Sequence, residues 1–194
     1  MISNNHMLTH LNCENSFALA SALYPFEDWI PHENGIFIAK SRLGGGHKEQ
    51  AKLYREISHI RILTRKGSVV YFLPERINGG NKGKKFADTV LDGSITEIKT
   101  ISGNRTTLGK SFKRGYKQGL SMLETYSEIE AEHNVFLRLY SSFTVESVRA
   151  KIAGEIKNTS NTGCCICYFE ATEKLYTWTY DELRAIVNIK RKRD

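Results

Sequence analysis

The fold is decided by residues 87–99, which read Ala-Asp-Thr-Val-Leu-Asp-Gly-Ser-Ile-Thr-Glu-Ile-Lys. The Asp-Gly pair in the middle separates two β-prone runs, so the pattern predicts two antiparallel strands joined by a tight turn. Side chains two residues apart leave the same face of a strand, so we expect Glu97 and Lys99 to lie together. The turn also brings Asp88 across from Glu97 or its neighbours. The sequence therefore predicts two carboxylates and an ammonium group on one patch of a hairpin.

Helical and strand patterns alternate on both sides of this hairpin. From Gly44 onward, periodicity and turn signals predict helix 47–62, strands 68–73, 86–91 and 95–101, helix 107–125, strand 135–140, a helix capped by Thr144, strands 164–169 and 175–179, and helix 181–189. The segment between the third and fourth of these strands is long enough for a parallel crossover. We therefore expect an α/β fold with a mixed sheet, in which an α-β-β-β-α-β core is followed by extra C-terminal strands and a helix.

The length of 194 residues suits one domain with some excess. The glycine triplet at 44–46 is the clearest interruption in the chain, and it divides the sequence into three predicted parts. Residues 1–43 form an N-terminal arm or small subdomain, in which 17–23 is a short helix and 36–38 a short strand. Residues 44–189 form the main α/β domain, and residues 190–194 form a basic tail.

The composition narrows the classes of protein that fit the sequence. Lys and Arg number 28 against 21 Asp and Glu, giving a formal charge of +7, which excludes an acidic mimic of nucleic acid. A hydrophobic fraction of 40% and a charged fraction of 25% are ordinary for a globular protein and exclude general disorder. No apolar run reaches the length of a membrane span, and the first residues lack the features of a signal peptide. We therefore expect a cytoplasmic protein with no membrane partner.

The predicted hairpin patch has the groups that phosphodiester hydrolysis uses. A hard divalent cation such as Mg²⁺ prefers oxygen ligands and is often held by one or two carboxylates. The cation lowers the pKa of bound water and neutralises charge on the phosphate. A neighbouring Lys can orient that water and stabilise developing negative charge. A Glu and a Lys two residues apart also occur on ordinary exposed strands, so the surrounding pattern has to support the functional interpretation.

The order of elements over residues 47–140 resembles the core of the PD-(D/E)XK nuclease superfamily. The recurrent positions of that family correspond here to Glu49 or Glu56 on the first helix, Asp88, Glu97 with Lys99, and Gln118 on the following helix. More narrowly, the sequence looks like the toxin domains of bacterial contact-dependent inhibition proteins, several of which are tRNA nucleases. Ala87 stands where the family usually has a proline, and this departure does not remove a ligand.

The resemblance implies a role for each matched residue. Asp88 and Glu97 would hold Mg²⁺ or Mn²⁺, with the carbonyl of Ile98 as a third ligand. Lys99 would position the attacking water, and Gln118 would orient water or phosphate.

The first-helix glutamate of the site is either Glu49 or Glu56. The two residues lie about 20° apart around a helix, and both flank its apolar face. We favour Glu49 because it is nearer the start of the helix and the glycines. The alternative for each of them, and for Gln118, is an ordinary solvated side chain.

A concentration of positive charge surrounds the hairpin. The basic residues that we expect to contact nucleic acid are Lys82, Lys84, Lys85, Arg105, Lys110, Lys113, Arg114 and Lys117. A basic helix face can bind several phosphates, although many such faces are only solvated. The toxin resemblance favours RNA, especially tRNA, and DNA is the close alternative because most enzymes of the superfamily act on DNA. A toxin of this kind usually meets an immunity protein.

Two other functions fit the sequence. One is a metal-independent RNase of the toxin type, which would cleave RNA in EDTA. The other is a non-catalytic module that binds nucleic acid without cleaving it. Its binding would be unaffected by replacement of Asp88 or Glu97 with alanine.

Overall fold

The computed structural model describes residues 4–75, 85–140 and 142–191, with side chains from residue 12 to residue 187 of these ranges. The chain divides into two compact units. The first unit comprises Met1–Thr96 and Ser121–Ala131, and the second comprises Glu97–Leu120 and Glu132–Asp194. Strand β5 and helix α4 each begin in one unit and end in the other. None of the helices in the described ranges has an apolar stretch long enough to cross a bilayer.

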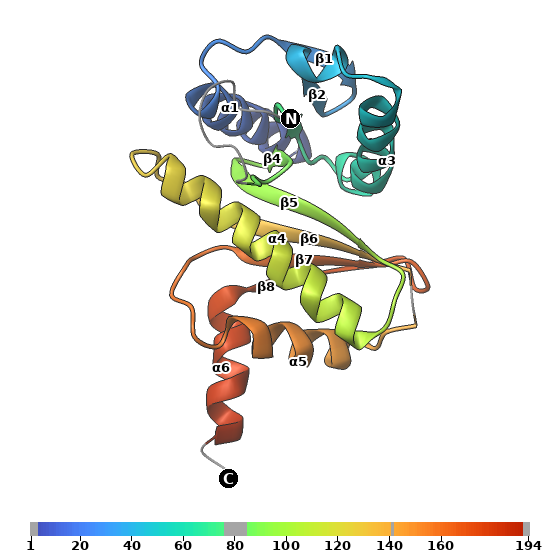
Figure 1. Ribbon diagram of the computed structural model, residues 1–194, viewed down its shortest axis with the longest axis vertical. Helices are drawn as coiled ribbons and strands as arrows, with labels where there is room; N and C mark the ends of the chain where they lie inside the picture. Colours follow the sequence, from blue (N-terminus) through green and yellow to red (C-terminus); the bar gives the residue numbers. More distant parts are fainter. Residues whose placement is uncertain (1–3, 76–84, 141, 192–194) are drawn as a thin grey trace. The chain divides into compact units, whose positions relative to one another are not determined.

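The first unit contains the N-terminal elements shown in blue to green in Figure 1. They are α1 (Asn4–Leu23), β1 (Trp29–Glu33), β2 (Ile36–Ala39), α2 (Lys40–Leu43), α3 (His47–Thr64), β3 (Val70–Phe72), β4 (Thr89–Leu91) and the start of β5 (Ser94–Ile101). Strand β2 is parallel to β3, whereas the β1–β2, β3–β4 and β4–β5 pairs are antiparallel. Residues 1–43 thus contribute two strands to the sheet of this unit.

The first unit has an apolar core beneath α1. Leu19, Ala20 and Leu23 of α1 are buried together with Tyr71 of β3 and Val90 of β4. Helix α3 buries a separate stripe at helical spacing, formed by Leu53, Ile57, Ile60 and Leu63. The sequence pattern predicted a face of Ala51, Leu53, Tyr54, Ile57 and Ile60, of which Leu53, Ile57 and Ile60 are buried while Ala51 and Tyr54 are exposed.

The second unit contains the rest of β5, most of α4 (Arg105–Thr125) and the C-terminal elements. These are β6 (His133–Leu139), α5 (Val145–Ile156), β7 (Cys164–Phe169), β8 (Lys174–Thr179) and α6 (Tyr180–Arg191). Strand β6 is parallel to β7, and β8 is antiparallel to β7. Thr144 caps α5 by accepting a hydrogen bond from the amide of Ser147, as its position in the sequence predicts.

The second unit has an apolar core formed by its helices and strands. Leu108 and Phe112 of α4 are buried with Val135 and Leu137 of β6 and with Ile152 of α5. Figure 1 shows α4 and α5 lying against the strands of this unit. Because one face of α4 is buried, its opposite face is exposed to solvent. The basic residues of this helix lie on that exposed face.

The expected fold class is confirmed. The eight strands form one mixed sheet in the order β1 to β8, with helices and with extra strands and a helix at the C-terminal end. The structure differs from the sequence-based expectation at several places. Strand β1 and helix α2 were not predicted, and α6 continues to Arg191, into the predicted tail. Helix α1 runs from Asn4, well before the predicted start at residue 17, and β4 begins at Thr89. Asp88 therefore lies just before β4, where its carbonyl accepts a hydrogen bond from the amide of Leu73.

The second unit contains a buried histidine whose ring nitrogens have no hydrogen-bond partner among the described residues. This residue is His133, the first residue of β6, and it has no exposed surface. Its ring packs against Tyr116 of α4 and Tyr180 of α6, with ring centroids 4.7 and 5.4 Å away. Burial lowers the pKa of His133 to about 4 because no neighbouring charge compensates the imidazolium ion.

We expect His133 to make the protein less stable in mild acid. The unfolded chain takes up the proton near pH 6.5, while the folded protein takes it up only near pH 4. The contribution of the neutral imidazole is therefore complete above pH 6.5 and is lost as the pH falls toward 4, by up to about 3 kcal/mol. Urea unfolding at several pH values measures this slope. His133→Phe should reduce the dependence of the free energy of unfolding on pH over this range. The control His47→Gln, at an exposed position, should leave that dependence unchanged. An unchanged dependence in His133→Phe would show that His133 does not cause it.

Candidate functional site

The hairpin that the sequence predicts is present between β4 and β5. Thr89 pairs with Thr96 and Leu91 pairs with Ser94. Asp92 and Gly93 connect the strands with φ angles of 48° and 80°, and positive values at both central residues are typical of a type I′ turn. The carboxylate of Asp92 accepts a hydrogen bond of 2.8 Å from the amide of Val69, so this carboxylate has a structural role in the turn.

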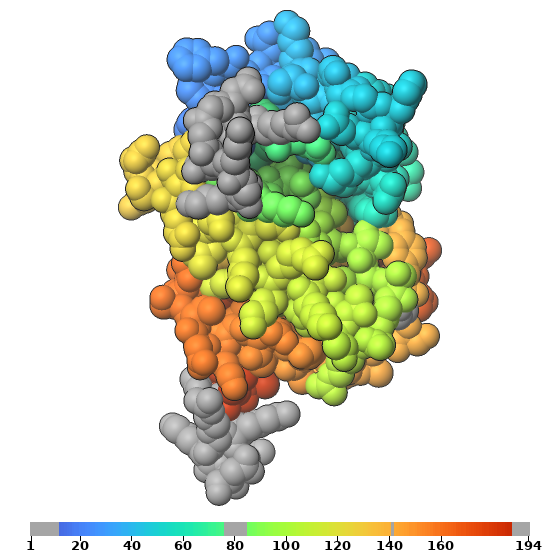
Figure 2. All heavy atoms as spheres, in the orientation of Figure 1, coloured from blue at the N-terminus to red at the C-terminus, as the bar shows by residue number. Residues whose placement is uncertain are grey.

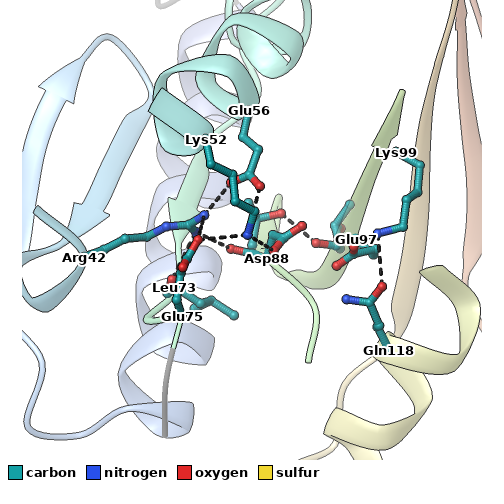
Figure 3. Close-up of polar contacts among 11 residues, drawn as sticks. Arg42, Lys52, Glu56, Leu73, Glu75, Asp88, Glu97, Lys99 and Gln118 are labelled. Carbon is teal, nitrogen blue, oxygen red and sulfur yellow. Dashed lines mark hydrogen bonds and ion pairs between the residues drawn. The ribbon is translucent and has the colours of Figure 1, made fainter. Parts of the chain in front are cut away.

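In the second unit, Glu97 and Lys99 of β5 form an ion pair. Glu97 has no exposed surface, and Lys99 is half-buried. The ammonium group of Lys99 also donates a hydrogen bond of 3.0 Å to Oε1 of Gln118 on α4 (Figure 3). Three residues that the sequence places at the site are therefore in contact within one unit. Ile98 lies between Glu97 and Lys99 on the same strand, with its side chain buried.

Gly115 of α4 makes this close approach possible. A Cβ atom at this position would lie 3.2 Å from Cγ of Glu97 and 3.2 Å from Cγ1 of Val135. Such distances are tighter than ordinary van der Waals contacts, so a larger residue would require Glu97 or Val135 to shift by a few tenths of an ångström. The sequence analysis did not identify Gly115. A glycine inside a predicted helix, three residues before a candidate site residue, is the signal that could have found it.

In the first unit, Asp88 belongs to a network of charged side chains (Figure 3). The ammonium group of Lys52, on α3, lies 3.8 Å from Oδ1 of Asp88, 3.3 Å from Oε1 of Glu56 and 2.8 Å from Oε1 of Glu75. Arg42 of α2 forms a second ion pair with Glu56 and lies 3.4 Å from Glu75. The three carboxylates of this network are thus arranged around two cationic side chains.

Arg42 is the most deeply buried member of this network. Only 3% of its side chain is exposed, and its guanidinium group lies 5.4 Å from the ring centroid of Phe72. Its Nη1 atom donates hydrogen bonds of 3.1 and 3.3 Å to the backbone carbonyls of Leu73 and Asp88. Arg42 therefore fixes the backbone that carries Asp88. It was missed in the sequence because it precedes the glycine triplet and is 46 residues from Asp88.

The two candidate glutamates of α3 have different surroundings. Glu56 is buried in the network with Arg42 and Lys52, where burial and the charge of Asp88 raise the pKa of Glu56 more than the two cations lower it. Glu49 is exposed, and its carboxylate accepts a hydrogen bond of 3.0 Å from the amide of Gly46 at the start of α3. The structure therefore brings Glu56 close to Asp88 and leaves Glu49 at the helix end, where it also lines a pocket with Arg42.

Exposed basic residues cover the outer side of α4, the yellow-green region in Figure 2. Lys110, Lys113, Arg114 and Lys117 form a stripe at helical spacing, and α4 has no acidic residue before Glu124. Gln118 follows Arg114 by one turn, so the stripe borders the side of the helix that carries Gln118. Arg105 is exposed at the start of α4, and Lys85 is exposed in the first unit. Lys82 and Lys84 lie outside the described residues.

Comparisons with known proteins identified no relative of this chain. A scan against models of protein families, a search of curated proteins and a search of solved structures each returned no match. None of the three comparisons identifies the PD-(D/E)XK superfamily, so the resemblance stays an expectation from the sequence.

Two glycines on helices provide a test of the packing at Glu97. Gly154 of α5 has open space around it, so Gly154→Ala should increase the free energy of unfolding by about 0.5–1 kcal/mol through helix propensity. Gly115→Ala gains the same propensity but crowds Glu97 and Val135, so we expect a net loss of about 1–2 kcal/mol. Urea denaturation measures both values. Equal stabilisation by the two substitutions would show that α4 does not pack closely on Glu97.

Proposed function

We propose that this protein is a metal-dependent nuclease that hydrolyses phosphodiester bonds in nucleic acid. The observation that carries the proposal is the contact of Glu97, Lys99 and Gln118 in the second unit. Glu97 and Lys99 come from one strand and Gln118 from the next helix, as in the family that the sequence resembles. A buried carboxylate held by an ammonium group beside an amide is a costly arrangement that catalysis explains better than stability does.

The resemblance to the PD-(D/E)XK family supports a role for Asp88 and Glu97 as ligands of a divalent cation, Mg²⁺ or Mn²⁺, with the carbonyl of Ile98 as a further ligand. In the first unit, Asp88 directly precedes Thr89, which pairs with Thr96 in the hairpin. In the second unit, Glu97 is fully buried beside Lys99.

The donor set fits such an ion, because carboxylate and carbonyl oxygens are the ligands that hard divalent cations prefer. When bound, the ion would lower the pKa of a water molecule and neutralise charge on the scissile phosphate. Lys99 has three N–H groups, of which two are directed to Glu97 and Gln118. We assign the third to the attacking water or to a phosphate oxygen. Glu56 would add negative charge next to Asp88, and Arg42 would keep the Asp88 backbone in place.

The basic stripe on α4 supports a nucleic-acid substrate. Its four residues are exposed, lie next to the side of α4 that carries Gln118, and have no ion pair within the described ranges. Phosphate groups supply most of the affinity of such surfaces without regard to sequence. Because of the resemblance to contact-dependent toxins we propose RNA, and tRNA in particular, as the substrate, with an immunity protein as a partner of a toxin of this type.

Loss of the carboxylates or the lysine should abolish cleavage. We expect Asp88→Asn, Glu97→Gln and Lys99→Met each to slow the hydrolysis of total tRNA by at least about 100-fold in Mg²⁺ or Mn²⁺. Glu124→Gln, on the exposed part of α4, is the matched control and should retain full activity. Plasmid DNA and other RNA in parallel identify the substrate. Cleavage that survives Glu97→Gln would refute the site, cleavage in EDTA would indicate the metal-independent RNase, and binding without cleavage would indicate the non-catalytic module.

The basic stripe should make binding of RNA strongly dependent on salt. Four phosphate contacts predict a slope of about −3 for the logarithm of the association constant against the logarithm of salt concentration. Lys113→Ala and Lys117→Ala should each reduce this slope by about 1. Fluorescence anisotropy with labelled tRNA in EDTA measures the slope without cleavage. Lys174→Ala, an exposed lysine on β8, should leave it unchanged, and equal effects of all three substitutions would mean that binding does not depend on α4.

A further inference from the structure

The ammonium group of Lys52 lies among three carboxylates of the first unit. Its distances to Glu75, Glu56 and Asp88 are 2.8, 3.3 and 3.8 Å, and Figure 3 shows these side chains converging on it. An ammonium group is a compact point charge. The positive charge of Lys52 is therefore surrounded by carboxylate oxygens of Glu75, Glu56 and Asp88.

The two cations of the network differ in how firmly they are held. Arg42 is almost fully buried and is tied to two backbone carbonyls, so it cannot leave without disturbing the chain. Lys52 contacts only side chains in this network, and 48% of its own side chain is exposed. A flexible four-carbon stem allows the ammonium group to move into solvent at little cost. Lys52 is thus the member that can be replaced.

The charges of the network favour such a replacement. Three carboxylates face two positive side chains, those of Arg42 and Lys52. A divalent cation in place of the ammonium group would therefore match these carboxylates better than a single positive charge does. Lys52 competes for the carboxylate oxygens with any such cation.

We propose that Lys52 is a built-in competitor of the divalent cation: its ammonium group holds Asp88 and Glu56 in the metal-free protein and has to be displaced when the ion binds. This inference rests on the proposed metal-dependent function. It assigns to Lys52 the role of a positioning residue that sets metal affinity, with no contact to the reacting atoms. The carboxylates stay arranged in the absence of metal, and the ion binds more weakly than the carboxylates alone would allow.

Metal affinity measured on the full chain tests the proposal without reference to cleavage. Binding of Mn²⁺ is followed by the electron paramagnetic resonance signal of the free ion and by isothermal titration calorimetry. We expect Lys52→Met, which keeps the aliphatic stem, to bind Mn²⁺ about tenfold or more tightly than the unsubstituted protein. Its melting temperature should be lower in EDTA and should rise more on addition of Mn²⁺, because repulsion among Asp88, Glu56 and Glu75 is then relieved only by the metal.

Controls separate this inference from the proposed function. Lys66→Met removes one positive charge just beyond the C-terminal end of α3 and should not change the affinity for Mn²⁺. If Lys52→Met fails to fold, Lys52→Gln takes its place in the test. Unchanged or weaker binding in the Lys52 variants, with Mn²⁺ bound by the unsubstituted protein and lost in Asp88→Asn, would overturn the role of Lys52 alone. Absence of Mn²⁺ binding in every variant would overturn both proposals.

Discussion

The register of the β4–β5 hairpin is the constraint on which the candidate site depends. Side chains alternate between the faces of a strand, so a slip of one residue would move every side chain of β5 to the opposite face. Three hydrogen bonds to two residues hold the turn in the first unit. Asp92 accepts a hydrogen bond from the amide of Val69 through its side chain and donates one to the carbonyl of Val69 through its own amide. The amide of Gly93 donates to the hydroxyl of Ser16 on α1. The N-terminal helix α1 thereby helps to fix the register of the β4–β5 hairpin, in addition to the turn residues themselves.

The parts of the structure that the sequence predicted are those specified by residues close together in the chain. The turn follows from Asp92 and Gly93, which tolerate positive φ angles, and the shared face of Glu97 and Lys99 follows from the geometry of any strand. Helix α3 is specified by apolar residues at a period of 3.6, and α5 by the cap at Thr144. Each of these features needs only a few neighbouring residues, so packing elsewhere does not alter it.

Features that depend on distant packing could not be predicted. Glu49 and Glu56 occupy nearly the same side of α3, and only the position of Arg42, outside that helix, separates the buried glutamate from the one that caps the helix. Most of α1 shows no apolar stripe, so a pattern search found only its last turns. A glycine at position 115 is visible inside the predicted helix, but the residues that it packs against, Glu97 and Val135, are set by distant parts of the chain.

Burial of charge distinguishes the candidate site from an ordinary polar surface. Taking an ion pair out of water costs several kcal/mol per ion, and apolar residues of similar volume are often as stabilising or more so. Glu97 is nevertheless fully buried beside Lys99 in the second unit, and Arg42 is buried beside Glu56 in the first. Each of these buried carboxylates has a cationic partner within its own unit, so its charge is compensated there. Stability alone would not select this arrangement twice. Each pair gives one carboxylate a fixed direction, that of Glu97 in the second unit and that of Glu56 in the first.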